Sequence, residues 1–161
     1  MSDIDIRPTD APHGALRPSE TNPPHRILVV DDEPNIRLTM IGMLSRSGYD
    51  VDAVKDGADA WGALQVKHYD LLITDNNMPK VSGVELLQRL QANRQAMPVI
   101  MATGSLPKED FSHSPWLQPF AILLKPFTVA ELLEKVQASL PARDGTRTRL
   151  DFLPILECQT S

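Results

Sequence analysis

The chain has 161 residues, enough for one domain with a substantial core and additional terminal segments. Hydrophobic residues make up 42% and charged residues 23%, which is typical of a soluble globular protein rather than a disordered chain. The net charge of -5 and the pI near 5.3 argue against a nucleic-acid-binding surface, which normally shows clustered Lys and Arg.

The sequence also indicates the cellular compartment. It contains no run of about 18 apolar residues, so we expect no membrane span. The first residues lack a basic start followed by an apolar stretch, so we expect no secretory signal. The single cysteine, Cys158, excludes a disulfide within the chain and fits a reducing compartment. We therefore expect a cytoplasmic protein.

Residues 1–25 contain five prolines and few large apolar side chains. Such a segment cannot bury enough apolar surface to offset its ordering entropy, so we predict a disordered N-terminal arm. From Arg26 onward the pattern changes to short apolar runs that alternate with helical periodicity. We expect residues 26–140 to form the single domain.

The apolar runs are continuous rather than alternating, as expected of parallel strands that are covered on both faces. One shorter, mixed run suits an edge strand. The expected strands are residues 27–30, 51–54 (the edge strand), 71–74, 99–102 and 120–124. Because helical segments alternate with these strands, the predicted fold class is an α/β doubly wound sheet.

The intervening segments show apolar residues at helical spacing. The first helix presents Ile36, Met40, Met43 and Leu44 on one face, residues 57–68 and 82–95 form two more helices, and the last presents Val129, Leu132, Leu133, Val136 and Leu140. The fourth segment differs, because Pro107, Pro115 and Pro119 interrupt it. We expect about two helical turns at most, starting near Ser105, in a short and mobile element.

Residues 141–161 form a C-terminal tail in which Pro141 and a polar linker precede a second apolar segment, 150–156. Two interpretations remain open. The apolar segment either folds back on the domain or serves as a docking peptide for another protein. The tail is too short to form a second domain.

Polar residues follow successive predicted strands at their carboxyl ends, where ligands bind in open α/β sheets. They are Asp31 and Asp32 after the first strand, Asp75 after the third, Thr103 after the fourth and Lys125 after the fifth. Each has an ordinary explanation, such as a helix cap, a turn or a surface lysine. Their coincidence favours a site. Two carboxylates about 4 Å apart repel by roughly 4 kcal/mol at an effective dielectric of about 20, so the cluster calls for a divalent cation.

The chain resembles the receiver domain of two-component response regulators. The matching segments are ILVVDDEP (27–34), LLITDNNMPKVSG (71–83), VIMATG (99–104) and LLKPF (123–127), in the family's order and spacing. The resemblance covers about residues 26–140. It implies a flavodoxin-like, five-stranded parallel sheet of order 2-1-3-4-5 with helices on both faces.

The resemblance also implies residue roles. Asp75 matches the phosphoacceptor, and Asp32 matches the residue that binds Mg²⁺ directly, with Asp31 acting mostly through water. The main-chain carbonyl of Asn77 matches a further metal ligand. Mg²⁺ prefers oxygen ligands and retains several waters, which suits this set. Asn77 and Ser105 flank the expected path of hydrolytic water and are expected to tune the lifetime of the acyl phosphate.

The same resemblance implies that Lys125 contacts a phosphoryl oxygen and that Thr103 turns its hydroxyl toward the phosphoryl group. It also implies a cis peptide bond before Pro126. One position departs from the family, because Ile122 stands where members often carry Tyr or Phe as a rotating partner of the threonine. We therefore hypothesise that output proceeds through ordering of segment 105–119.

The implied function is a phosphoacceptor that takes phosphate from a histidine kinase or phosphotransfer protein and signals by protein contact or phosphate relay to an unknown downstream protein. It is not expected to be an enzyme. A Mg²⁺-dependent hydrolase would need an acid at position 77, where this chain has Asn77, and a nucleotide-binding domain would need a glycine-rich turn after the first strand. A receiver-like adaptor that works without phosphorylation remains the alternative. The four histidines lack the spacing of a metal site, and both tryptophans are interpreted as packing groups.

Overall fold

The computed structural model describes residues 23–106 and 108–141. Most of the expected N-terminal arm and all of the tail beyond Pro141 lie outside the described residues. Strands and helices alternate along the described chain. The elements are β1 (Arg26–Val30), α1 (Pro34–Arg46), β2 (Asp50–Val54), α2 (Gly57–Val66), β3 (Leu71–Thr74), α3 (Gly83–Ala92), β4 (Val99–Thr103), α4 (Lys108–His113), β5 (Ala121–Leu124) and α5 (Val129–Ser139).

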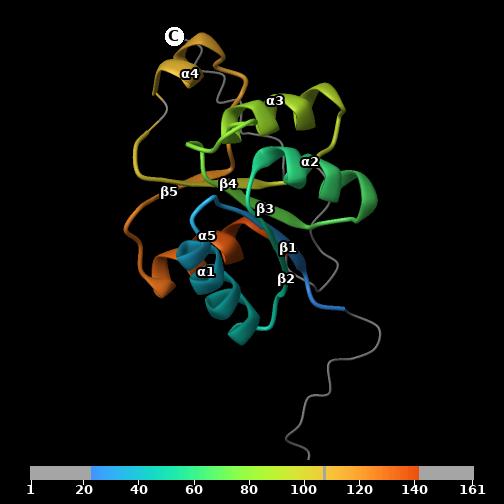
Figure 1. The fold of residues 1–161 in the computed structure, drawn as a ribbon, viewed down its shortest axis with the longest axis vertical. Coiled ribbons are helices and arrows are strands. Elements are labelled where there is room, and N and C mark those ends of the chain that lie inside the picture. Colours follow the sequence, from blue (N-terminus) through green and yellow to red (C-terminus); the bar gives the residue numbers. More distant parts are fainter. Residues whose placement is uncertain (1–22, 107, 142–161) are drawn as a thin grey trace, which may run out of the picture.

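The strands form one parallel sheet in the order β2-β1-β3-β4-β5, which confirms the predicted fold class and strand order. Figure 1 shows α1 and α5 on one face of this sheet and α2 and α3 on the other. Because the strands are parallel, their carboxyl ends lie along the same edge. The sheet therefore brings the loops that follow β1, β3, β4 and β5 to that edge.

The central strands are buried on both faces, as their continuous apolar runs predict. In β1, Leu28 and Val30 belong to the core cluster under α2 and α3, whereas Ile27 and Val29 belong to the cluster under α1 and α5. This division follows the two-residue period of a strand. The outer strands β2 and β5 have partly exposed residues, so the mixed composition of β2 correctly predicts an edge strand.

Local sequence explains where most helices begin. The capping box Ser82–Glu85 opens α3, and Thr128–Glu131 opens α5 in the same way. The Asp56 carboxylate accepts the Asp59 N–H at the start of α2. Helix α1 instead has Pro34 in its first turn and no side-chain cap. The ordinary role considered for the aspartates that follow β1, capping this helix, is therefore wrong.

Several expectations about the helices need adjustment. Helix α4 has six residues, so the prediction of a short helix is confirmed. It begins at Lys108, however, rather than near Ser105 as predicted. The apolar spacing of α5 predicts Val129 on its buried face, but Val129 is the first residue of the helix and is 44% exposed. Trp116 was interpreted as a packing group, but it is 69% exposed. Trp61 does pack against the core, with the Arg89 guanidinium 5.8 Å from its ring centroid.

No helix in the described ranges is long and apolar enough to cross a membrane.

Candidate functional site

Three carboxylates meet at the carboxyl edge of the sheet. Val30 of β1 pairs with Thr74 of β3, so the residues that follow these strands, Asp31 and Asp75, are neighbours. One oxygen each of Asp31, Asp32 and Asp75 lies within 4.8 Å of the others. Asp31 and Asp75 are buried, and Asp32 is exposed. At this separation each pair of charges repels by at least about 3 kcal/mol at an effective dielectric of about 20.

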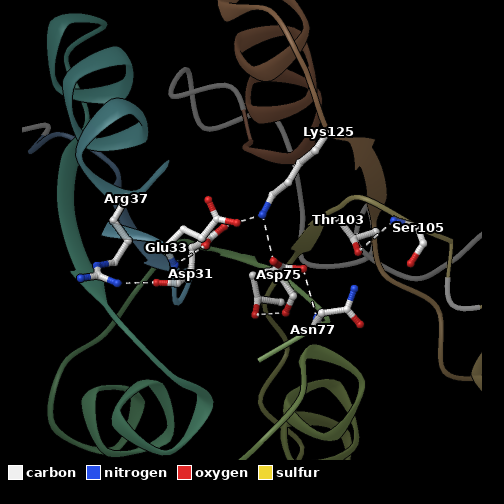
Figure 2. A network of polar contacts seen from close by, with 9 residues as sticks. Asp31, Glu33, Arg37, Asp75, Asn77, Thr103, Ser105 and Lys125 are labelled. Carbon is white, nitrogen blue, oxygen red and sulfur yellow. Dashed lines mark hydrogen bonds and ion pairs between the residues drawn. The ribbon is translucent and has the colours of Figure 1, made fainter. Parts of the chain in front are cut away.

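The Lys125 ammonium lies between two of these carboxylates, as Figure 2 shows. Its Nζ is 2.7 Å from Asp31 Oδ2 and 2.9 Å from Asp75 Oδ2. Desolvation of this largely buried lysine opposes its charge, but the hydrogen bonds and the charges of the two carboxylates outweigh it and raise the pKa of Lys125. The lysine thus stays protonated and binds β5 to the ends of β1 and β3. The Lys125–Pro126 peptide bond is cis, as expected.

Asp31 accepts two further hydrogen bonds, one through its side chain and one through its main chain. Its Oδ1 accepts the Glu33 N–H at 2.9 Å, and its main-chain carbonyl accepts Arg37 Nη1 at 2.7 Å. Arg37 lies in the first turn of α1, one turn beyond the aspartates, and its side chain reaches back to the end of β1 (Figure 2). Arg37 is not among the residues predicted for the site. The signal that could have indicated it is a cation one helical turn after paired acids.

The loop between β3 and α3 shapes the surroundings of Asp75. The Asn77 N–H donates to Asp75 Oδ1 at 3.1 Å, while the Asn77 side chain is exposed. Asn76 folds the loop, because its side-chain oxygen accepts the Val84 N–H and its carbonyl accepts the Gly83 N–H. A Cβ at Gly83 would lie 2.5 Å from the Asp75 carbonyl oxygen, so this close approach requires glycine.

Thr103 ends β4 and is fully buried. Its Oγ1 accepts the Ser105 N–H at 3.5 Å, a long and therefore weak hydrogen bond. The side-chain hydrogen bonds of the described residues join Thr103 to Ser105 rather than to the acidic cluster. The structure therefore brings Asp31, Asp32, Asp75, Asn77 and Lys125 together. The Thr103 carbonyl accepts the Lys125 N–H at 2.9 Å, so Thr103 adjoins the cluster through its main chain, while its hydroxyl is bonded to Ser105.

The sequence profile of the response regulator receiver domain matches residues 27–137. The chain belongs to this family. Two solved receivers are similar to it over most of their length. Chemotaxis response regulator CheY4 of Vibrio cholerae is 30% identical, with 73% of this chain and 99% of that chain covered and a TM-score of 0.65. Response regulator TrrA of Thermotoga maritima, solved in complex with Mg(2+)-BeF, is 34% identical, with 72% and 99% covered and a TM-score of 0.65.

Curated relatives are longer than this receiver. Response regulator RppA of Synechocystis sp. is 36% identical over 115 residues, which cover 70% of this chain and 49% of RppA. Sensor protein EvgS of Escherichia coli O157:H7 is 45% identical over 73 residues, 45% of this chain and 6% of EvgS. The chain thus aligns with about half of one relative and a small part of the other.

Receiver domains are phosphoacceptors of two-component signalling and generally not enzymes; they partner with histidine kinases and bind Mg²⁺ at an acidic pocket. The donor set of this receiver fits Mg²⁺. Its carboxylates are hard oxygen ligands, and two of the three are buried. Three carboxylates and one ammonium leave a net charge of two negative units when all are ionised, which a divalent cation would neutralise. Within the described ranges, this is the one acidic or histidine cluster that could hold a metal.

Proposed function

We propose that this receiver accepts a phosphoryl group on Asp75, with Mg²⁺ held by Asp31, Asp32, Asp75 and the main-chain carbonyl of Asn77. The observation that carries the proposal is the position of Lys125, whose ammonium contacts the carboxylates of both Asp31 and Asp75. A lysine that only stabilised the fold would not need to reach from the end of β5 to the proposed nucleophile at the end of β3.

The chemistry follows from these contacts. A carboxylate oxygen of Asp75 attacks phosphorus and forms an acyl phosphate, and the donor's leaving group departs with its bonding electrons. The Asn77 N–H on Oδ1 and the Lys125 ammonium on Oδ2 fix the orientation of the Asp75 carboxylate. As the new bond forms, Lys125 can transfer its hydrogen bond to a phosphoryl oxygen, since lysine acts as a point charge. The divalent cation, when bound, supplies charge stabilisation to the transferring group.

We further propose that the signal leaves through Thr103. The phosphoryl group adds close to two negative charges and three acceptor oxygens. Turning the Thr103 hydroxyl toward it would break the weak hydrogen bond that Thr103 accepts from Ser105. That change reaches segment 105–119 directly and does not need an aromatic side chain at Ile122. Hydrogen exchange in this segment should therefore change when beryllofluoride, a phosphoryl mimic, is added with Mg²⁺. Unchanged exchange would contradict this route.

The expected partners are a histidine kinase or histidine phosphotransfer protein upstream and an unidentified protein downstream, reached by contact or by phosphate relay. Support comes from the likeness to a sensor protein and to a response regulator. The acidic composition disfavours a nucleic-acid partner. A cytoplasmic location remains part of this proposal, as do an N-terminal arm before Arg26 and a tail after Leu140.

The decisive experiment is incubation of the full chain with acetyl phosphate and Mg²⁺, followed by intact mass measurement. We expect the addition of one phosphoryl group, its loss in Asp75→Asn, and its retention in Asp59→Asn, which removes an exposed carboxylate on α2. Consumption of the donor should be stoichiometric apart from slow hydrolysis. A chain that never gains mass, yet still binds a partner, would instead be the phosphorylation-independent adaptor.

A further inference from the structure

A second buried carboxylate lies outside the acidic cluster. The Asp56 side chain, between β2 and α2, is 3% exposed, and its Oδ2 is 3.2 Å from Lys80 Nζ. Its Oδ1 accepts the Asp59 N–H at 2.8 Å. This backbone hydrogen bond is the main cause that holds the pKa of Asp56 below its usual range; desolvation opposes it, and Lys80 adds to it. Asp56 is thus ionised, and Lys80 is its cationic partner.

Lys80 belongs to the loop between β3 and α3, which also carries Asn77. Its φ of 69° lies in the left-handed region, which is uncommon for a residue other than glycine and costs free energy. Met78 and Val81 each donate a main-chain hydrogen bond within this loop, to Asn76 and Pro79. One tight turn thus spans Asn76 to Met78 and the next spans Pro79 to Val81, so only two residues separate Asn77 from Lys80 in a compact stretch of loop.

A second contact joins the same two segments next to the ion pair. A Cβ on Gly57, the residue after Asp56, would lie 2.3 Å from the Val81 carbonyl oxygen and 2.7 Å from Val81 Cβ. Val81, the residue after Lys80, is itself 5% exposed and belongs to the core cluster under α2 and α3. The start of α2 and this loop are thus in direct contact at two adjacent positions, one ionic and one steric.

We infer that Lys80 and Asp56 are positioning residues for phosphorylation: their ion pair fixes the loop after Asp75 against the start of α2 and so holds the Asn77 carbonyl where the metal ligands converge. The inference rests on the proposed function of that site. It assigns a role to a carboxylate and a cation that lie outside the acidic cluster and that touch none of the proposed reacting atoms.

The size of the expected effect follows from exposure. The Lys80 side chain is 63% exposed, so water screens the pair, and its contribution is that of a partly exposed ion pair. Removing the ammonium should raise the Mg²⁺ concentration for half-saturation by about two- to fivefold, as expected if most of the free energy of a partly exposed ion pair supports the metal site. The maximal rate at saturating Mg²⁺ should be unchanged, because the Asp75 and Lys125 contacts do not involve Lys80.

The test uses the full chain with Lys80→Met, which removes the charge and keeps an unbranched stem. Lys67→Met is the matched control, since Lys67 pairs with Asp52 at 3.0 Å at the C-terminal end of α2, away from Asp56 at its start. Mg²⁺ binding is measured by calorimetry without phosphodonor, and the acetyl phosphate rate is measured against Mg²⁺ concentration. We expect weaker binding for Lys80→Met, wild-type binding for Lys67→Met, and recovery with Lys80→Arg.

The outcomes separate the two proposals. If the unmodified chain is never phosphorylated, the proposed function fails. If it is phosphorylated but Lys80→Met binds Mg²⁺ like Lys67→Met, the positioning role is wrong. Asp56→Asn provides an independent check, because asparagine can still accept the Asp59 N–H but lacks the charge. It should weaken Mg²⁺ binding as Lys80→Met does, and the double variant should be no weaker than either; additive losses would overturn the pairing.

Discussion

Replacing Lys125 by methionine tests whether its ammonium offsets the charge of the acidic cluster. The substitution leaves Asp31 and Asp75 without the cation that lies 2.7 and 2.9 Å from their oxygens. The Lys125, Asp31 and Asp75 side chains are 17%, 1% and 9% exposed, so solvent can screen the remaining charges only in part.

The magnitude can be worked from these distances. A contact of about 2.8 Å between opposite charges contributes roughly 6 kcal/mol at an effective dielectric of about 20, before desolvation is subtracted. Removing one partner of a buried ion pair costs about 3–5 kcal/mol. Because Asp32 opens the cluster to solvent, we expect Lys125→Met to lower the free energy of unfolding by about 2–4 kcal/mol in the presence of a chelator.

Magnesium should reverse much of this loss. A ligand at about 100 times its dissociation constant stabilises the folded state by about 2.7 kcal/mol. In the variant, no ammonium competes with the metal for the Asp31 and Asp75 carboxylates. We expect Mg²⁺ binding to restore about 1.4 kcal/mol of the stabilisation lost with Lys125, which corresponds to an affinity about tenfold higher than that of the unmodified chain. Phosphorylation should nevertheless slow, because no ammonium remains to contact the phosphoryl group.

Urea unfolding, with chelator and with Mg²⁺, measures both effects, since urea does not screen charges. Lys55→Met, an exposed lysine after β2, is the control and should change neither value. Equal stability of Lys125→Met and the unmodified chain in chelator would refute the electrostatic reasoning. So would a Mg²⁺-dependent stabilisation no larger than that of the unmodified chain.

Three further outcomes are expected. The hydrogen bond from Tyr69 is the main cause that lowers the pKa of Asp52. The ionised Asp52 therefore stabilises the folded state above the unfolded pKa of about 3.9, and this contribution is lost as the pH falls through the lower folded pKa. Tyr69→Phe should therefore lower the unfolding free energy near pH 7 by about 0.5–1 kcal/mol and flatten its decline below about pH 4, measured by urea unfolding. Gly83→Ala should destabilise by about 1–3 kcal/mol and slow phosphorylation, because its Cβ would meet the Asp75 carbonyl oxygen at 2.5 Å. Removing residues 142–161 should leave Mg²⁺ affinity and the acetyl phosphate rate unchanged, since every residue proposed for the site precedes position 142.

The order and type of the elements could be predicted from the sequence because the signals are local. Continuous apolar runs such as Leu71–Thr74 have no plausible place except between two layers of helices, and that is where β3 lies. The polar residues at the strand ends could be predicted as one group for a related reason. Parallel strands bring their carboxyl ends to the same edge, so Asp31 and Asp75 become neighbours once the strands are paired.

Exposure at the ends of elements was predicted less well. Val129 continues the apolar spacing of α5, but at the first position of the helix it is 44% exposed. Trp116 is large and apolar, yet it lies between α4 and β5 with its side chain in solvent. Periodicity reports which face of a helix is apolar and not how far the opposing layer extends.

Contacts between distant residues were decided by the tertiary structure. Residue types suggested that Lys125 belongs to the site, but only the packed sheet shows it bridging two particular carboxylates. The Asp56–Lys80 pair had no sequence signal, because its members are separated by a helix and a strand and meet only where α2 and the loop after β3 pack together. Apolar patterning is read from neighbours along the chain, whereas a charge pair depends on distances that exist only after the layers have closed.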